Sequence, residues 1–301
     1  KVCILGIQGF PEMNHNILHE IEWSTSMMSI DKKMPAPIHM IGKSIRNREM
    51  IVKLAKNDFR TKYAGSYFGI AWAFVSHIVT ILLYWFVFQI GFRSQPVGDY
   101  PFVLWLTAGL VPWFFFSDAW NGATNSLMEY SFLVKKVVFD IEILPAIKIV
   151  SSFMVNIFFT VFVVILFMLN GFGLTLHMLQ LIYSLVCIMV LTWGLSYLTS
   201  AVVVFVRDLS HFLGVALQVL MWLTPIMWNI SMLDKYPWLA SLMRLNPVFY
   251  IVQTYRDAMF NGCWFWERPL WSCYFWGLTI LIFLAGTSVF SKLKSHFADV
   301  L

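Results

Sequence analysis

Six long apolar segments, separated by polar or mixed stretches, dominate the hydrophobic pattern of the chain. A helix needs about 20 apolar residues to cross a hydrocarbon layer of about 30 Å. Backbone groups in lipid must be hydrogen-bonded within the segment, which favours helices. The pattern therefore predicts an all-α polytopic membrane protein with six transmembrane helices near residues 70–92, 102–122, 145–169, 177–206, 211–230 and 270–290.

Residues 46–66 directly precede the first expected span and mix apolar positions with many cations. This composition is typical of an amphipathic helix that lies in the membrane surface and contacts lipid phosphates. The alternative is a soluble linker with helical propensity. The residues that we assign to this interfacial helix are Lys53, Lys56, Arg60, Lys62 and Tyr63.

The connection 123–144 is too long and too apolar for a simple turn between two spans. Its charged residues exclude a span, so we expect a short helix beneath the membrane that inserts into a groove of a partner protein. The alternative is that the segment packs back on the ends of this protein's own helices. The candidate contact residues are Tyr130, Phe132, Leu133, Lys135, Lys136 and Phe139.

The segment 231–269 is rich in aromatic residues but has no apolar run of spanning length. Asn246 followed by Pro247 predicts a helix start, and Gly262 predicts its end after about Phe260. Residues 239–245 form a shorter candidate helix. We expect two re-entrant half-helices in the outer leaflet, because broken backbone at that depth is tolerated when it is buried in protein.

Composition and charge support the membrane class and predict its orientation. The chain is 59% hydrophobic and 12% charged, against roughly a quarter charged in soluble domains. Lys and Arg concentrate before the first span, after the second and in the C-terminal tail, which, for a protein of the plasma (inner) membrane, predicts that both termini are cytoplasmic. The net charge of +5 follows from this bias and gives no case for a nucleic-acid partner. Residues 1–45 are expected to be an N-terminal extension, disordered or artefactual, before a six-span membrane domain at 46–301.

Motifs for catalysis, metal binding or ATP binding do not emerge from the sequence. The stretch "IGKS" at 41–44 imitates the end of a phosphate-binding loop, but Pro37 stands where that loop requires Gly. The seven His residues have no acidic or Cys neighbours at metal-ligand spacing. We therefore expect no enzyme activity, no metal site and no cofactor on this chain.

Polar and aromatic side chains inside two spans are candidates for a substrate path. In the first span, hydroxyl and aromatic residues recur every four positions. Sugars suit such a wall, because their C–H faces stack on rings while their hydroxyl groups form hydrogen bonds. The aromatic face of the second span either lines the path or meets lipid, and Asp118 should face protein or water. The candidates are Ser76, Thr80, Tyr84, Phe88, Trp113, Phe116 and Trp120. Ordinary helix packing is the alternative.

Several segments together resemble the type-2 ABC exporter permeases, in the branch that exports O-antigen, capsule or teichoic acid. The similarity covers about 55–301 and rests on five motifs in order: "NDFRTKYAGSYFGIAWAF" (57–74), "FVRDLSHF" (205–212), "LTPIMW" (223–228), "NPVFYIVQTYRDAMF" (246–260) and "FSKLKSHFADVL" (290–301). Two departures are Ser76–His77, where the family often has Gln-Pro, and Phe139–Asp140, where it usually has Phe-Pro.

The resemblance implies a homodimer of permeases with two separate ATP-binding subunits, which would bind ATP and Mg²⁺. It makes 123–144 the coupling helix, 46–66 the interfacial gate helix and a lipid-linked glycopolymer the substrate. The alternatives are a type-2 drug or lipid exporter, or a secondary transporter, which would need ionisable residues near mid-membrane.

Overall fold

The computed structural model describes residues 36–63, 66–134 and 140–301. Helices form nearly all of the ordered elements in these ranges, and the only β-bridge in this part of the chain joins Val97 to Tyr100. The expected all-α class is therefore confirmed. The principal helices are α2 (Ala36–Arg46), α3 (Arg48–Lys62), α4 (Trp72–Trp85), α5 (Phe102–Glu129), α6 (Ser131–Val134), α7 (Leu144–Leu169), α8 (Gln180–Val203), α9 (Asp208–Leu223), α10 (Pro237–Arg244), α11 (Pro247–Arg256), α12 (Pro269–Leu293) and α13 (Phe297–Val300).

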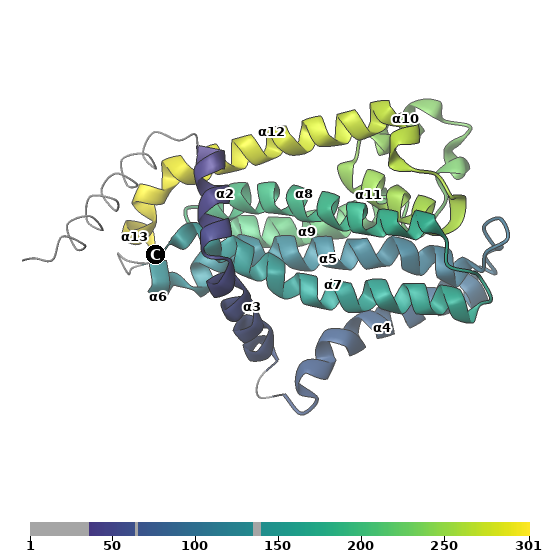
Figure 1. Ribbon diagram of the computed structural model, residues 1–301, viewed down its shortest axis with the longest axis horizontal. Helices are drawn as coiled ribbons and strands as arrows, with labels where there is room; N and C mark the ends of the chain where they lie inside the picture. The colour runs from purple at the N-terminus through teal and green to yellow at the C-terminus, as the bar shows by residue number, and fades with distance from the viewer. Residues whose placement is uncertain (1–35, 64–65, 135–139) are drawn as a thin grey trace, which may run out of the picture.

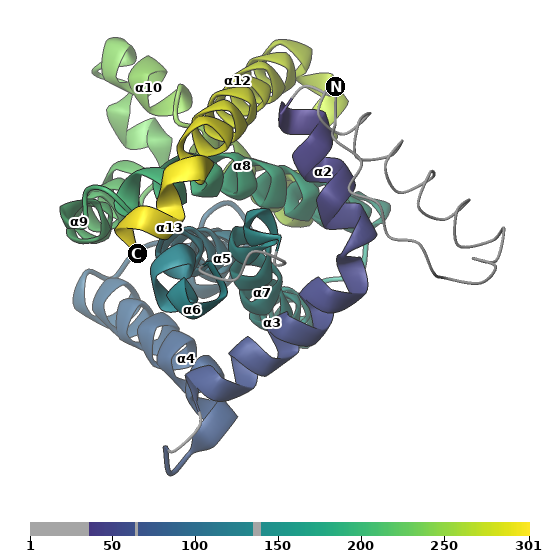
Figure 2. The ribbon, with the colours of Figure 1, turned by 90° about the vertical axis from the view of Figure 1, so that its left-hand side faces the viewer.

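The long helices run side by side, and the two ends of the bundle differ (Figure 1). α2, α3, α6 and α13 lie at one end, which we call the basic end, and α10 and α11 lie at the other, which we call the distal end. Seen along the bundle, α5 is surrounded by other helices whereas α4 lies at the periphery (Figure 2).

α5 is the centre of the hydrophobic core. In its most apolar 18-residue window 78% of the residues are buried, against 11% in the span that contains α4. The contrast follows from the sequence of α5, whose ring-bearing and small residues pack on α7, α8 and α11. α4 instead leaves Val79, Leu82 and Leu83 exposed. Exposed apolar side chains on a helix of spanning length are the surface that lipid or another membrane helix covers.

Five of the expected spans are helices long and apolar enough to cross a membrane: Gly69–Gly91, Phe102–Glu129, Ile141–Leu169, Leu176–Val203 and Pro269–His296. The first runs without a break through Ser76–His77, and its last part, η2 (Phe86–Gly91), is a π-helix.

The expected span at 211–230 differs from the prediction. Its helix, α9, has 16 residues, about 24 Å at 1.5 Å per residue, which is short for a hydrocarbon layer of about 30 Å. Thr224 is extended, with ψ of 129°, and Pro225 follows, which disfavours helix at the preceding residue. The chain therefore leaves the helix several residues before the end that hydropathy alone predicts.

At the basic end, α2 lies inside the range 1–45 that the sequence assigned to an extension. Its Met40 is 1% exposed and belongs to a hydrophobic cluster with α3, α8 and α12 residues, among them Ile51, Tyr197 and Phe290. The ordered protein thus includes at least ten residues more than the domain boundary at 46 predicts. α3 confirms a helix within 46–66, and its four expected cations are all exposed.

At the distal end, the helix predicted after Asn246 is present. The Asn246 side chain accepts a hydrogen bond of 2.9 Å from the amide of Val248, and Pro247 is the first helical residue. α11 continues into a π-helical turn, η6 (Asp257–Asn261), and Gly262 ends it with φ of 59°, a left-handed conformation that favours glycine. The shorter partner helix is α10, two residues ahead of its expected start.

Candidate functional site

The connection that follows α5 carries the residues predicted to dock a partner. Phe132 in α6 is 59% exposed, whereas the Tyr130 hydroxyl donates a 2.7 Å hydrogen bond to Asp58 of α3. Tyr130 therefore packs back on the protein, whereas Phe132, two residues later, is exposed, and its docking to a partner stays a prediction. Lys135, Lys136 and Phe139, and the side chain of Leu133, lie outside the described residues.

Buried charges fix the start of this connection. Lys148 of α7 contacts two carboxylates, Asp58 of α3 at 2.7 Å and Glu129 at the end of α5. Asp58 is buried, so its charge needs these partners. Burial, together with the hydrogen bond to Asp58, raises the pKa of Tyr130 and keeps its hydroxyl group protonated as a donor. The pairs hold α3, α5 and α7 together at the point where the connection leaves the bundle.

A second charged cluster fixes the end of the connection. The Lys43 ammonium of α2 lies 2.8 Å from Asp140 and 3.2 Å from Glu142, and Lys294 beyond α12 lies 2.6 Å from Glu142. Asn47 also donates to Asp140, at 3.1 Å. Helix α2 and the C-terminal segment thus meet where the chain enters α7.

The pKa values in this cluster favour the charged pair. Burial alone would lower the pKa of Lys43, but the hydrogen bond to Asp140 and the charges of Glu142 and Asp140 outweigh it, so this pKa is raised. Burial alone would raise the pKa of Asp140, but the hydrogen bond and charge of Lys43 lower it. The sequence carries no local signal for this cluster, because its members are distant in the chain.

The stripe predicted on the first span is only partly available to a ligand. The hydroxyl groups of Ser76 and Thr80 each donate 2.9 Å hydrogen bonds to carbonyls one turn earlier in their own helix. Tyr84 is half-buried and its hydroxyl contacts the Met221 sulfur of α9 at 3.9 Å. Phe88 packs on Phe102 at the start of α5. The two aromatic residues therefore join α4 to neighbouring helices, and their role in a path stays a prediction.

The aromatic face of the second span lies inside the bundle. Trp113 and Phe116 are 3% and 1% exposed, and Trp120 donates a 3.2 Å hydrogen bond to the hydroxyl group of Thr199 on α8. The sequence left open a path or lipid contact for this face, and within this chain it is core. Burial in the core of the bundle, rather than contact with lipid, accounts for these rings.

The opposite face of α5 carries the ionisable residue that was expected to face protein or water. Asp118 lies 3.2 Å from Nε2 of His77 in α4, so the expectation is confirmed. The other nitrogen of His77 lies 2.8 Å from the carbonyl oxygen of Ala73. The sequence singled out both residues but did not predict that they pair.

Arg256 at the end of α11 is a buried cation that sequence reasoning missed. Its two terminal nitrogens donate hydrogen bonds to the carbonyls of Pro225 and Ile226, at 2.7 and 2.6 Å. Its guanidinium group lies over the Trp105 ring, 3.4 Å from the centroid. Arg256 therefore satisfies the carbonyl groups exposed where α9 ends, and it fixes α5, α11 and the 224–228 segment together.

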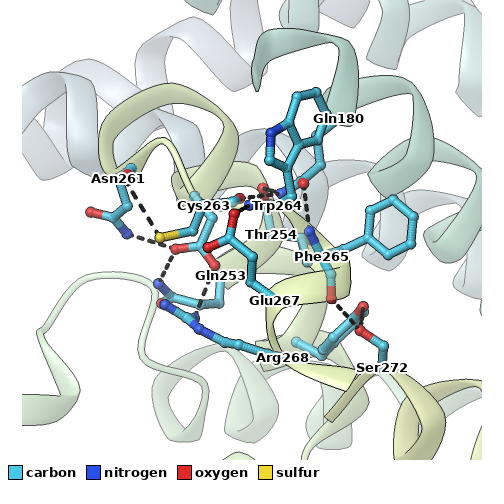
Figure 3. Close-up of polar contacts among 12 residues, drawn as sticks. Gln180, Gln253, Thr254, Asn261, Cys263, Trp264, Phe265, Glu267, Arg268 and Ser272 are labelled. Atoms are coloured by element: carbon cyan, nitrogen blue, oxygen red, sulfur yellow. Dashed lines mark hydrogen bonds and ion pairs between the residues drawn. The ribbon is translucent and has the colours of Figure 1, made fainter. Parts of the chain in front are cut away.

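A cavity of about 910 Å³ opens beside this arginine at the distal end. Aromatic rings, amides and three arginines line it; the members that carry the argument below are Arg244, Gln253, Arg256, Asn261, Arg268 and Tyr274. Behind this lining, the buried Asp257 accepts hydrogen bonds from Gln253, Asn261 and Arg268, whose side chains converge (Figure 3).

Comparison with known proteins places the chain in a transporter family. Residues 50–260, which run from α3 to η6, match the family described as ABC-2 type transporter. The chain belongs to this family. The matched range contains the α5–α7 connection, the His77–Asp118 pair and Arg256, whereas α2 and α12 lie outside it.

Individual relatives of this ABC-2 chain are named for O-antigen export or for polysialic acid transport. It is 27% identical over 261 residues to the O-antigen export system permease protein RfbA of Klebsiella pneumoniae, covering 84% of this chain and 95% of the relative. It is 22% identical over 262 residues to the protein of the same name from Myxococcus xanthus, covering 87% and 99%. It is also 22% identical over 207 residues to the polysialic acid transport protein KpsM of Escherichia coli, covering 68% and 79%.

Proposed function

We propose that this chain is the membrane permease subunit of an ATP-driven exporter of a cell-surface polysaccharide. The observation that carries the proposal is that relatives named for O-antigen export or polysialic acid transport align over 79% to 99% of their own length. The family match adds the transporter class. A polymer of the O-antigen or capsule type, carried on a lipid, is the substrate that the proposal assigns.

The assembly that we propose contains two copies of this chain and two ATP-binding subunits, which bind ATP and Mg²⁺. The exposed apolar side of α4 supports a surface covered by a second copy or by lipid. The basic end faces the cytoplasm in this proposal, because its exposed Lys and Arg residues suit the anionic inner leaflet. α9 counts as the fifth of the six spans, and α10 with α11 as the re-entrant half-helices before the sixth.

Coupling to ATP is assigned to the α5–α7 connection. The exposed Phe132 offers an apolar side chain to a groove of the ATP-binding subunit. The ion pairs of Lys148 and Lys43 attach both ends of the connection to α3, α7 and α2. Movement of the docked subunit would therefore shift several helices together instead of bending a free loop.

A deletion of the gene in its native host, with plasmid rescue, tests the proposal. We expect surface polysaccharide to disappear, polymer to accumulate inside the cell, and both effects to be reversed by the wild-type chain. Normal surface polysaccharide combined with increased sensitivity to apolar drugs would contradict the proposal and favour the drug-exporter alternative.

A further inference from the structure

The distal cavity is a formed site rather than a gap between mobile loops. Its volume of about 910 Å³ lies within the range of about 300–1,000 Å³ that is typical of ligand pockets. The loop on one side of it is fixed by Gln180 of α8, which accepts from the amide of Phe265 at 2.8 Å and donates to the carbonyl of Cys263 at 3.2 Å (Figure 3). Ser272 donates to the carbonyl of Phe265, also at 2.8 Å.

Asp257 orients two amide side chains toward this cavity. Gln253 and Asn261 donate through their NH₂ groups to Oδ1 of Asp257, at 2.9 and 2.6 Å, and Arg268 donates to Oδ2 at 2.9 Å. The amides stand one helical turn on either side of Asp257, so they share its face. With their nitrogens fixed, the side-chain carbonyl oxygens of Gln253 and Asn261 accept no hydrogen bond within the described residues. They are available to the hydroxyl groups of a ligand.

A second wall presents an unstacked ring and an unpaired cation. Trp271 and Tyr274 of α12 donate to the carbonyls of Arg244 and Leu245, at 3.1 and 2.9 Å, which satisfies the C-terminus of α10. The Tyr274 ring packs on no other ring in the described part of the chain and is 37% exposed. Arg244 is exposed and makes no ion pair with any described acidic residue.

Charge indicates which ligand the cavity favours. Arg244, Arg256 and Arg268 line it against one lining carboxylate, Asp99. Among the described residues, Arg268 pairs with Asp257, whereas Arg256 donates hydrogen bonds to neutral carbonyl groups and Arg244 makes no ion pair. The site combines a ring for stacking, amide oxygens for hydroxyl groups and excess positive charge. These are the features that a sugar ring bearing an acidic group requires.

We propose that the distal cavity binds acidic sugar units, with Tyr274 stacking on the ring, the amides of Gln253 and Asn261 accepting from its hydroxyl groups, and Arg244 pairing with its carboxylate or phosphate. This site deepens the proposed function and rests on it for the origin of the sugar. An anionic lipid headgroup offers the same acidic chemistry without the sugar ring, so the test separates the two.

Direct binding to the purified full-length chain tests the site independently of export. In nanodiscs of phosphatidylcholine, we expect a hyaluronan hexasaccharide, which carries glucuronate, to bind at least tenfold more tightly than neutral chitohexaose of the same length. Arg244→Gln should weaken hyaluronan binding by about tenfold, because a charge-assisted hydrogen bond is lost, and should leave chitohexaose binding unchanged. Lys235→Gln is the matched control, since Lys235 is an exposed cation near α10 that does not line the cavity.

A pair of substitutions at Tyr274 tests separately whether its ring stacks on the sugar. Tyr274→Phe should keep most of the affinity for hyaluronan, whereas Tyr274→Leu should lose it, provided that both variants elute as wild type in gel filtration. Equal binding of the two oligosaccharides, or no effect of Arg244→Gln, would overturn the proposal. In phosphatidylglycerol nanodiscs, the anionic lipid could compete with hyaluronan for the site. If hyaluronan binding is lost there, and if this competition requires Arg244, the site would be assigned to a lipid headgroup instead. A chain that exports polysaccharide but fails these tests refutes the site alone, and a chain that binds hyaluronan but restores no surface polymer refutes the proposed function alone.

Discussion

A β-carbon at Gly109 would lie 2.7 Å from the terminal Nη2 nitrogen of Arg256, and 3.3 Å from the carbonyl oxygen of Ile226. Gly109 stands in the middle of the aromatic face of α5. Because it has no side chain, the guanidinium group can occupy the space beside its backbone. Trp105, one turn earlier, supplies the ring beneath the same group. This face of α5 therefore accommodates a buried cation that hydrogen-bonds to the carbonyls of Pro225 and Ile226, just after α9.

Gly109→Ala should destabilise the protein by about 1–3 kcal/mol, because the added methyl group must displace a guanidinium group held by two carbonyls. The measurement is thermal unfolding of the purified chain, followed by tryptophan fluorescence. Gly214→Ala in α9 is the matched control, since a β-carbon there has no neighbour within 4 Å, and it should be neutral or slightly stabilising.

A double-mutant cycle makes this test specific to the pair. With Arg256→Met in place, the additional cost of Gly109→Ala should shrink markedly, because the group that the methyl displaces is gone. Fully additive effects of the two substitutions would show that Gly109 serves some other purpose.

The Lys43–Asp140 pair should make stability depend on pH at both extremes. The pKa of Asp140 is lowered in the folded protein, so its contribution is present above the ordinary value of about 3.9 and is lost as the pH falls through the folded pKa. The pKa of Lys43 is raised, so its contribution is present below about 10.4 and is lost as the pH rises through the folded value. In Asp140→Asn, the unfolding temperature should depend less on pH in both windows than it does in the wild-type chain. If the unfolding temperature of that variant falls at acidic pH as it does in the wild-type chain, Asp140 does not contribute to the pH dependence.

Phe132→Asp should leave the permease folded but uncouple it from its ATP-binding partner. The substitution places a charge where an apolar groove is expected, which costs about 2 kcal/mol or more. The partner should fail to co-purify with the membrane complex. Tyr130→Phe is a useful comparison, because it removes only the hydrogen bond to Asp58 and keeps the exposed Phe132 intact. Wild-type co-purification and export with Phe132→Asp would place the docking surface elsewhere.

Substitutions at Tyr84 distinguish a sugar path from helix packing. If its ring stacks on passing sugars, Tyr84→Trp should retain more export per folded complex than Tyr84→Leu, which keeps bulk without a stacking face. If Tyr84 only joins α4 to α9, Leu should serve as well as Trp, and Tyr84→Ala should mainly lower stability, by about 2–5 kcal/mol. Surface polymer and unfolding temperature, measured on the same variants, separate the two outcomes.

Hydrophobic periodicity predicted the elements whose length is set by the membrane, together with local helix signals such as Asn246–Pro247 and Gly262. It overestimated the span at 211–230, because apolar residues continue past Pro225 although the backbone has left the helix. It could not predict Arg256, since a cation that binds carbonyls 30 residues away leaves no mark in its own neighbourhood. The same limit applies to Lys43, whose acidic partners follow a hundred residues later in the chain. The sequence also could not decide the role of the aromatic face of α5, because rings are equally suited to a buried core and to the wall of a path for sugars.

The most direct test of the central claim is ATP-dependent transport by a reconstituted complex. The chain and its ATP-binding partner would be placed in liposomes with lipid-linked polymer, and the fraction of polymer accessible to a glycosidase on the far side would be measured after adding ATP and Mg²⁺. We predict that the fraction of polymer accessible to the glycosidase rises with ATP hydrolysis. This rise should be absent in Phe132→Asp. Vigorous ATP hydrolysis with no movement of polymer, alongside transport of a small apolar drug by the same complex, would contradict polysaccharide export.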